Sequence, residues 1–281
     1  VVVFLILGIL LVFSRIGGVE GLFDVVYDQF SIPPIFTEFL TRPWTLITYS
    51  FAHSLSGIFH ILFNMLILFW FSKLIVEYLG NDKVISLYVV GALAGGIAYL
   101  IVYNVIPFYM DSATNISGMV GASAAVYATV VAAATLLPNY TFYLLFFGPV
   151  KIKYIAAFYI VISFLGSVGA NAGGNVAHLG GALVGYVYIR QLQSGTDLGA
   201  WVIQFIDFVK SFFVKKSTIK VTHKKEKVKT SRTRKSSGSA ISSSSNASQE
   251  EIDAILDKIS HSGYESLTKS EKQKLFNASK K

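Results

Sequence analysis

The sequence predicts an all-α membrane protein with six transmembrane helices, followed by a cytoplasmic tail that ends in a small helical hairpin. Of its 281 residues, 53% are hydrophobic and only 14% are charged, and its mean hydropathy is +0.57. One core of a soluble domain could not bury so much apolar surface, whereas apolar runs of about 20 residues can cross a bilayer. The charge is unevenly divided, with eight Lys and Arg against nine Asp and Glu up to Val214, and sixteen against seven after it.

Six apolar runs account for the predicted transmembrane helices. The first run is short, and we expect it to be a transmembrane helix that begins before residue 1. It has neither the basic leader nor the small-residue cleavage pattern of a signal peptide. The predicted spans are Val1–Phe13, Ile58–Val76, Val84–Val105, Ile116–Leu137, Tyr154–Ala170 and Val176–Leu192. Between the first two spans, residues 14–57 form a long polar and aromatic loop.

Loop charges predict the orientation of the chain. Six spans place both termini on one side, and the basic tail assigns that side to the cytoplasm. Lys83, Lys151 and Lys153 then fall in cytoplasmic turns, whereas Asp111 and the acidic first loop fall outside. We therefore expect a multi-pass protein of a bacterial inner membrane with both termini cytoplasmic.

The chain after the last span is expected to contain three parts. The six-helix domain covers residues 1–195, and residues 196–214 are predicted to form an amphipathic helix in the membrane interface. Residues 215–248 are basic and Ser-rich, which predicts a disordered linker near anionic lipid. They lack the interleaved aromatic residues of a nucleic-acid surface, so no nucleic acid is expected. Residues 249–281 are predicted to form a helical hairpin that docks on a partner the sequence does not name.

The residue types in the predicted membrane domain limit the possible chemistry. There is no carboxylate between Asp111 and Asp197, which argues against a protease with two aspartates in the membrane. There is no His-Glu-x-x-His motif of a zinc peptidase and no cysteine nucleophile. A hydroxyl group activated by an imidazole remains, and this chemistry needs no cofactor or metal.

The candidate nucleophile and base lie on two different predicted helices. Ser123 lies in the sequence Gly-Ala-Ser-Ala near the start of the fourth span, and His178 lies in the sixth. Gly181 and Gly185 share the helical face of His178, and glycines there let a neighbouring helix approach closely. Tyr127 follows Ser123 by four residues and could pack on the imidazole. The alternative interpretation is an ordinary glycine-lined helix contact in which one polar residue forms a hydrogen bond between the helices.

A third polar cluster lies on the second predicted span. His60 and Asn64 are four residues apart, so both project from one helical face. Acyl transfer needs hydrogen-bond donors at the developing oxyanion, and these two side chains with the backbone N–H of Ser123 could supply them. Alternatively, the two residues could simply tie helices together.

Together these residues resemble the rhomboid family of intramembrane serine proteases. The matching residues, between about Arg42 and Arg190, are His53, His60-x-x-x-Asn64, Gly121-x-Ser123 with Tyr127, and Ala177-His178-x-x-Gly181-x-x-x-Gly185. The resemblance implies a six-helix bundle with a water-accessible cavity on the extracytoplasmic side, and cleavage of transmembrane protein substrates near that face. It also implies Ser123 as nucleophile, His178 as general base, His60 and Asn64 in the oxyanion hole, and His53, Gly121, Tyr127, Gly181 and Gly185 as supporting residues.

The sequence departs from the family pattern at one position beside the nucleophile, and other functions are possible for its polar residues. Ala124 replaces the glycine that usually follows the family's serine, and its methyl could crowd the backbone beside the nucleophile. A transporter would be expected to show internal repeats, and none is visible. A zinc site of His53, His60 and His178 would leave Asn64 and Ser123 without a role. A rhomboid-like protein that binds membrane segments without cleaving them is not excluded by the sequence.

Overall fold

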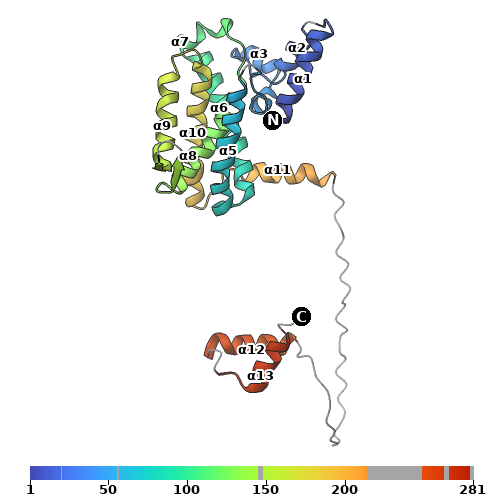
Figure 1. Ribbon diagram of the computed structural model, residues 1–281, viewed down its shortest axis with the longest axis vertical. Coiled ribbons are helices and arrows are strands. Elements are labelled where there is room, and N and C mark those ends of the chain that lie inside the picture. The colour runs from blue at the N-terminus through green and yellow to red at the C-terminus, as the bar shows by residue number, and fades with distance from the viewer. Residues whose placement is uncertain (20, 56, 145–147, 214–248, 263–265, 279–281) are drawn as a thin grey trace, which may run out of the picture. The chain divides into compact units, whose positions relative to one another are not determined.

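The computed structural model is mainly helical and divides into two compact units (Figure 1). It describes residues 1–19, 21–55, 57–144, 148–213, 249–262 and 266–278. The predicted linker, residues 215–248, lies outside the described residues.

The core of the first unit is a bundle of five helices arranged side by side (Figure 1). They are α5 (Ile58–Leu79), α6 (Asn81–Val105), α8 (Ser123–Leu136), α9 (Ile152–Gly166) and α10 (Ala172–Gln193). The central helix is α8, which contacts the other four. Its residues 124–134 are all buried, and most are Ala or Val, because small side chains let four neighbours pack around one axis.

Shorter elements surround this bundle. They are α1 (Val2–Ile16), α2 (Leu22–Asp28), α3 (Phe36–Thr41), α4 (Thr45–Thr48), η1 (Tyr49–Phe51), α7 (Pro107–Met110), η2 (Ala113–Asn115), β1 (Thr141–Leu144), β2 (Gly148–Lys151) and α11 (Ala200–Ser211). The antiparallel hairpin of β1 and β2 pairs Thr141 with Lys151, and it leads into α9. The sequence predicts only a turn in this region, so the hairpin is an addition to the predicted all-α fold.

Two of the described helices, α5 and α6, are long and apolar enough to cross a membrane by length and composition. Three shorter apolar helices, α1, α8 and α9, have 15, 14 and 15 residues. Many apolar side chains on the outer faces are exposed, among them Phe158, Phe164 and Leu165 on α9. Such exposure fits helices that face lipid instead of water.

The predicted fourth span, Ile116–Leu137, is wrong at its start. The helix begins only at Ser123, and the preceding residues run as an extended segment. Met119 and Ile32 exchange backbone hydrogen bonds of 3.0 and 2.9 Å, and Gly121 donates its N–H to the carbonyl of Tyr49 at 2.9 Å. Gly121 has φ of +137°, which no right-handed helix accommodates. Backbone groups of Met119 and Gly121 therefore form hydrogen bonds with the first loop instead of the bonds that a longer helix would have formed.

Glycines on α10 bring that helix unusually close to α8. A methyl group placed on Gly181 would lie 2.1 Å from the carbonyl oxygen of Ala124, and one on Gly185 would lie 2.2 Å from that of Ala128. Contacts this short leave no room for a Cβ atom. The two backbones therefore touch directly, as in other membrane helix pairs built on small residues.

A polar cluster fixes the connection from α10 to α11 at one end of the bundle. The carboxylate of Asp197 pairs with Lys83 and accepts hydrogen bonds from the Tyr188 hydroxyl at 3.1 Å and the Gly199 N–H at 3.0 Å. Ser86 donates to the carbonyl of Gly199 at 3.0 Å. Burial by itself raises the pKa of Asp197, but these hydrogen bonds and the Lys83 charge outweigh it and hold that pKa below its ordinary value.

The helix that follows, α11, lies across the bundle helices instead of along them (Figure 1). Val202 is buried against the bundle, whereas Phe205, Phe208 and Phe212 are exposed. Its bounds, Ala200–Ser211, fall inside the predicted segment 196–214.

The second unit contains α12 (Gln249–Ser262) and α13 (Lys269–Ala278). The two helices are joined by ion pairs of Lys258 with Glu271 at 3.0 Å and of Lys274 with Glu251 at 3.1 Å. Glu271 also accepts hydrogen bonds from the backbone N–H and hydroxyl of Thr268, which closes a capping box at the start of α13. These two bonds, followed by the Lys258 ammonium, lower the pKa of Glu271 to about 2.

Candidate active site

Ser123 and His178 lie next to each other in the bundle. Ser123 is the first residue of α8, and His178 lies in the first half of α10. The hydroxyl oxygen of Ser123 lies 2.7 Å from Nε2 of His178. The close packing at Gly181, three residues after His178, makes this distance possible. A serine hydroxyl within hydrogen-bond reach of an imidazole nitrogen is the arrangement that activates a nucleophile.

The other side of the imidazole is held by two residues from two helices. The ring of Tyr127 stacks on the ring of His178, with centroids 4.2 Å apart and planes inclined by 12°. Ser163 on α9 lies 3.1 Å from Nδ1 of His178 and donates its proton to the hydroxyl of Tyr127 at 2.8 Å. The imidazole is thus fixed on one face and at both nitrogens.

The predicted oxyanion donors are placed differently from each other. His60 lines the same cavity as Ser123 and Gly121. Asn64 is buried, and its amide donates to the backbone carbonyl of His60 at 2.8 Å. Asn64, in contrast to His60, is not one of the described residues that line the cavity. One N–H of the Asn64 amide is therefore committed to its own helix.

His53 lies beside His60, with ring centroids 5.8 Å apart. It is almost fully buried, and within the described part of the chain neither of its ring nitrogens has a hydrogen-bond partner. No group of three or more His, Cys, Asp or Glu side chains that could hold a metal ion occurs among the described residues. The three histidines of the zinc alternative are thus not gathered into one site.

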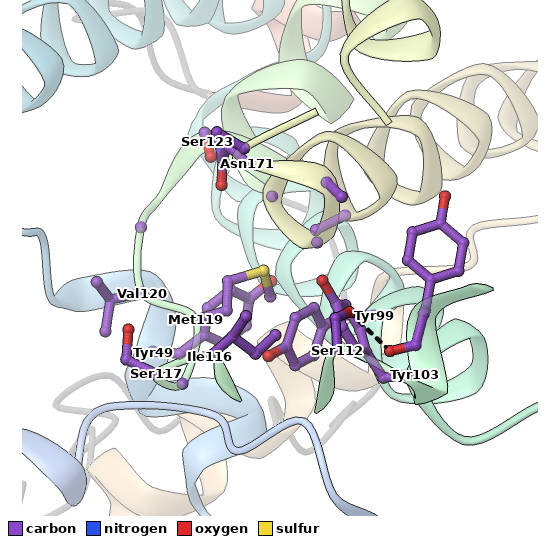
Figure 2. A pocket seen from close by; sticks show the side chains of 18 of the residues that line it. Tyr49, Tyr99, Tyr103, Ser112, Ile116, Ser117, Met119, Val120, Ser123 and Asn171 are labelled. Atoms are coloured by element: carbon purple, nitrogen blue, oxygen red, sulfur yellow. Dashed lines mark hydrogen bonds between the residues drawn. The ribbon is translucent and has the colours of Figure 1, made fainter. Parts of the chain in front are cut away.

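A cavity of about 800 Å³ opens in front of Ser123. Its walls come from the extended segment before α8, from the loop before α10, and from five tyrosines. The tyrosines are Tyr27, Tyr49, Tyr99, Tyr103 and Tyr109. Figure 2 shows Ser123 at one end of this wall, with Tyr99 and Tyr103 gathered away from it. The lining is polar as well as aromatic, so it can take up water and a peptide backbone.

The methyl of Ala124, which could have crowded the nucleophile, has a matching space on α6. Ala124 is buried, and a methyl group placed on Gly95 would lie only 2.4 Å from its Cβ atom. The glycine at position 95 therefore provides the room that the family's second glycine would have provided on α8. The backbone beside Ser123 keeps its close contact with α10.

Sequence reasoning missed two residues of this site. Ser163 is a polar residue within an apolar run, and this pattern could have identified it, because a polar side chain in a membrane helix usually forms a hydrogen bond with a neighbouring helix. Gly95 belongs to a series of small residues that also includes Gly91, spaced for close packing of helices. In neither case does the sequence show which helix lies opposite.

Comparisons with known proteins show similarity over two parts of the chain. The sequence model of the Rhomboid domain matches residues 40–194, which is more than half of the chain. A family of unknown function (DUF6576) matches residues 242–281. A protein of Arabidopsis thaliana described as "RHOMBOID-like protein 12, mitochondrial" is 34% identical over 167 residues, covering 55% of this chain and 48% of that protein.

The chain thus spans about half the length of this relative. No solved structure matches the chain. The matched range contains all of the bundle helices and every residue of the site described above. The chain belongs to the rhomboid family and is a membrane protein of that family.

Proposed function

We propose that the protein is an intramembrane serine endopeptidase that hydrolyses peptide bonds in or near the transmembrane segments of other membrane proteins. The observation that carries the proposal is the 2.7 Å contact between the hydroxyl of Ser123 and Nε2 of His178 at the wall of a large polar cavity. Family membership supports the same chemistry.

The contact supports a two-step acyl transfer. In the first step His178 takes the proton of Ser123 as its oxygen attacks the scissile carbonyl carbon, and then gives that proton to the leaving amine. The resulting ester on Ser123 is hydrolysed by a water molecule that His178 deprotonates in turn. The two steps together consume only the substrate and one water molecule, and they need no cofactor.

The N-terminus of α8 supplies part of the oxyanion hole in this proposal. Ser123 is the first residue of the helix, so the N–H groups of its first turn have no partner within the helix and carry the positive end of the helix dipole. His60 lines the cavity and adds a side-chain donor. Asn64 is proposed to contribute through the second N–H of its amide.

The short length of α8 explains how water would reach a site within the membrane. Its 14 residues cover about 21 Å, against about 30 Å of hydrocarbon. Because its N-terminus starts at the cavity, Ser123 would lie roughly 9 Å below one membrane surface. The hydroxyl of Tyr99, which is buried at the cavity without a partner among the described residues, suits a bound water molecule.

The proposed topology has six spans with both termini cytoplasmic, in the inner membrane of a bacterium. It counts α1, α5, α6, α8, α9 and α10 as the spans of residues 1–195, with substrates entering from the extracytoplasmic side. Residues 196–214 then lie in the cytoplasmic interface through the exposed phenylalanines of α11. The basic residues 215–248 face anionic lipid, and residues 249–281 dock on a further protein.

A covalent probe tests the proposal directly. A fluorophosphonate is expected to label the wild-type protein in detergent micelles, with the adduct on Ser123, and to label neither Ser123→Ala nor His178→Ala. The same two variants are expected to lose cleavage of a reconstituted transmembrane substrate. Their melting temperatures should stay within about 2–4 °C of the wild type, which corresponds to a change of roughly 1 kcal/mol in the free energy of unfolding. Labelling that survives Ser123→Ala places the nucleophile elsewhere.

The competing function is a rhomboid-like protein that binds transmembrane segments in the same cavity without cleaving them. Crosslinking of a transmembrane peptide to the wild type, together with absent labelling and cleavage, would favour this function.

For the proposed serine endopeptidase, cleavage is expected to persist in the presence of a chelator, since the proposed chemistry uses no metal. Inhibition by the chelator would contradict the serine mechanism.

A further inference from the structure

Ser163 is a buried hydroxyl that contacts the histidine of the proposed dyad on the side away from the nucleophile. It lies on α9, has no exposed surface, and is not among the described residues that line the cavity. Its oxygen lies 3.1 Å from Nδ1 of His178. It therefore cannot touch a substrate in the cavity, and any effect it has on the reaction must pass through the imidazole.

The direction of the second hydrogen bond of Ser163 decides what it does to His178. A serine hydroxyl has one proton, and that of Ser163 is donated to the hydroxyl oxygen of Tyr127 at 2.8 Å. Towards Nδ1 of His178 the oxygen of Ser163 can therefore only accept. A neutral imidazole that donates from Nδ1 carries no proton on Nε2. Nε2 is then free to accept the proton of Ser123.

The other tautomer would disable the site. If Nε2 carried the proton of the neutral ring, it would donate to the oxygen of Ser123 and could not remove the serine proton. In an apolar bundle Nδ1 would otherwise have no fixed partner, and no carboxylate of α8, α9 or α10 is available to fill that place. The Ser163 hydroxyl is the group that the structure puts there.

We propose that Ser163 is a positioning residue, which holds His178 in the tautomer that acts as the base for Ser123. The proposal rests on the proposed serine endopeptidase function. Tyr127 has two roles in this arrangement: its ring stacks on the imidazole, and its hydroxyl oxygen accepts the hydrogen bond that Ser163 donates. A histidine held in this way by a serine is the neutral counterpart of the aspartate that orients histidine in a catalytic triad.

Kinetic variants test the role of the hydroxyl. Ser163→Ala is expected to lower kcat by about 10- to 100-fold, a fraction of the roughly 100- to 10,000-fold that a positioned base supplies. KM is expected to stay within about twofold, because Ser163 does not reach the cavity and substrate binding is untouched. Ser163→Thr, which keeps a hydroxyl, is expected to restore most of the lost rate. An unchanged kcat in Ser163→Ala would overturn the proposal.

Two controls separate the hydroxyl from packing. Ser167→Ala makes the same change one turn after Ser163, at the C-cap that follows α9, where the hydroxyl donates to the carbonyl of Phe164 at 2.6 Å. It is expected to cleave as the wild type does. Tyr127→Phe keeps the stacked ring but frees the proton of Ser163 to point at Nδ1, so it is expected to lose rate as well. Wild-type activity in Tyr127→Phe contradicts the assigned direction of the bond.

A spectroscopic measurement decides the tautomer without any catalysis. Nitrogen-15 NMR of the full chain with labelled histidine, with the His178 signals identified by their loss in His178→Ala, distinguishes the two neutral tautomers. The wild type is expected to show a proton on Nδ1, and Ser163→Ala a mixture of both forms. This remains measurable if Ser163→Thr folds poorly. A wild-type proton on Nε2, or an unchanged signal in Ser163→Ala, would overturn the proposal.

Failure of the proposed function looks different. In that case the wild type and Ser123→Ala are equally inactive and unlabelled, while the tautomer of His178 still responds to Ser163→Ala. If instead the wild type cleaves and Ser163→Ala changes neither kcat nor the tautomer, the protease remains and only the positioning role falls.

Discussion

Replacement of Gly181 by alanine should separate Ser123 from His178 without changing either residue. The new methyl would lie 2.1 Å from the carbonyl oxygen of Ala124, whereas ordinary van der Waals contact begins at 3.4 Å. To remove the overlap, α10 and α8 must move apart by up to 1.3 Å, the difference between these distances. Both partners of the clash lie within one helical turn of the dyad, so the displacement reaches it almost undiminished.

A shift of this size exceeds what the hydrogen bond tolerates. The contact between Ser123 and His178 is 2.7 Å, and even half of the displacement would stretch it to about 3.3 Å, past the usual limit for such bonds. Misplacement by about 1 Å typically costs on the order of 100-fold in rate. We therefore expect Gly181→Ala to lose about 100-fold in kcat, together with about 1–3 kcal/mol of stability from overpacking.

Gly185→Ala is the matched control for this prediction. Its methyl would lie 2.2 Å from the carbonyl of Ala128, so the overlap is nearly the same, but it lies one turn further from the dyad. We expect a similar fall in melting temperature in detergent and a smaller loss of substrate cleavage. If Gly181→Ala cleaves a transmembrane substrate at the wild-type rate, or if both variants lose rate equally, the proposed link between this contact and the dyad is refuted.

Three further predictions concern the stability of the two units. Gly95→Ala should lower the melting temperature because its methyl meets that of Ala124 at 2.4 Å, and adding Ala124→Gly should recover part of the loss, measured as a double-mutant cycle. Asp197→Asn removes the ion pair with Lys83 and should lower stability by about 1 kcal/mol, or about 2–4 °C, at pH 7. Because the pKa of Asp197 is lowered in the folded state, this contribution is fully present above the ordinary value of 3.8 and is lost as the pH falls through the lowered pKa, so the stabilities of the two proteins should converge in acid below 3.8. Glu271→Ala should speed amide hydrogen exchange in residues 269–278, and the wild type should match it only as pH falls from 4.5 towards the lowered pKa of about 2.

The sequence by itself indicated most of the helices and the residues that carry the chemistry. Length and apolarity located the bundle helices within a few residues, except at the start of α8, because a helix that faces lipid must be apolar along its length. His178 was identifiable because an ionisable side chain in such a run is costly and needs a purpose. The spacing of Gly181 and Gly185 from His178 marked the face on which another helix would pack.

The start of α8 could not be read from composition. Residues 116–122 continue the apolar run of the residues that follow, so hydropathy does not separate them from the helix. They are not helical, and the backbone of Ile32, far away in sequence, bonds to Met119. The hairpin of β1 and β2 was likewise hidden in a short loop. Backbone pairing between distant segments has no local signature, so the sequence could not show either feature.

Only the tertiary structure decided the surroundings of the dyad. The sequence named a serine and a histidine, but Ser163 and Gly95 became visible only when α9 and α6 were placed against them. A hydrogen bond of 2.7 Å depends on the separation of two helices to within a fraction of an ångström, which many packed side chains set together. Residue types determine which chemistry is available to this protein, and the packing of its helices determines whether the reacting atoms meet.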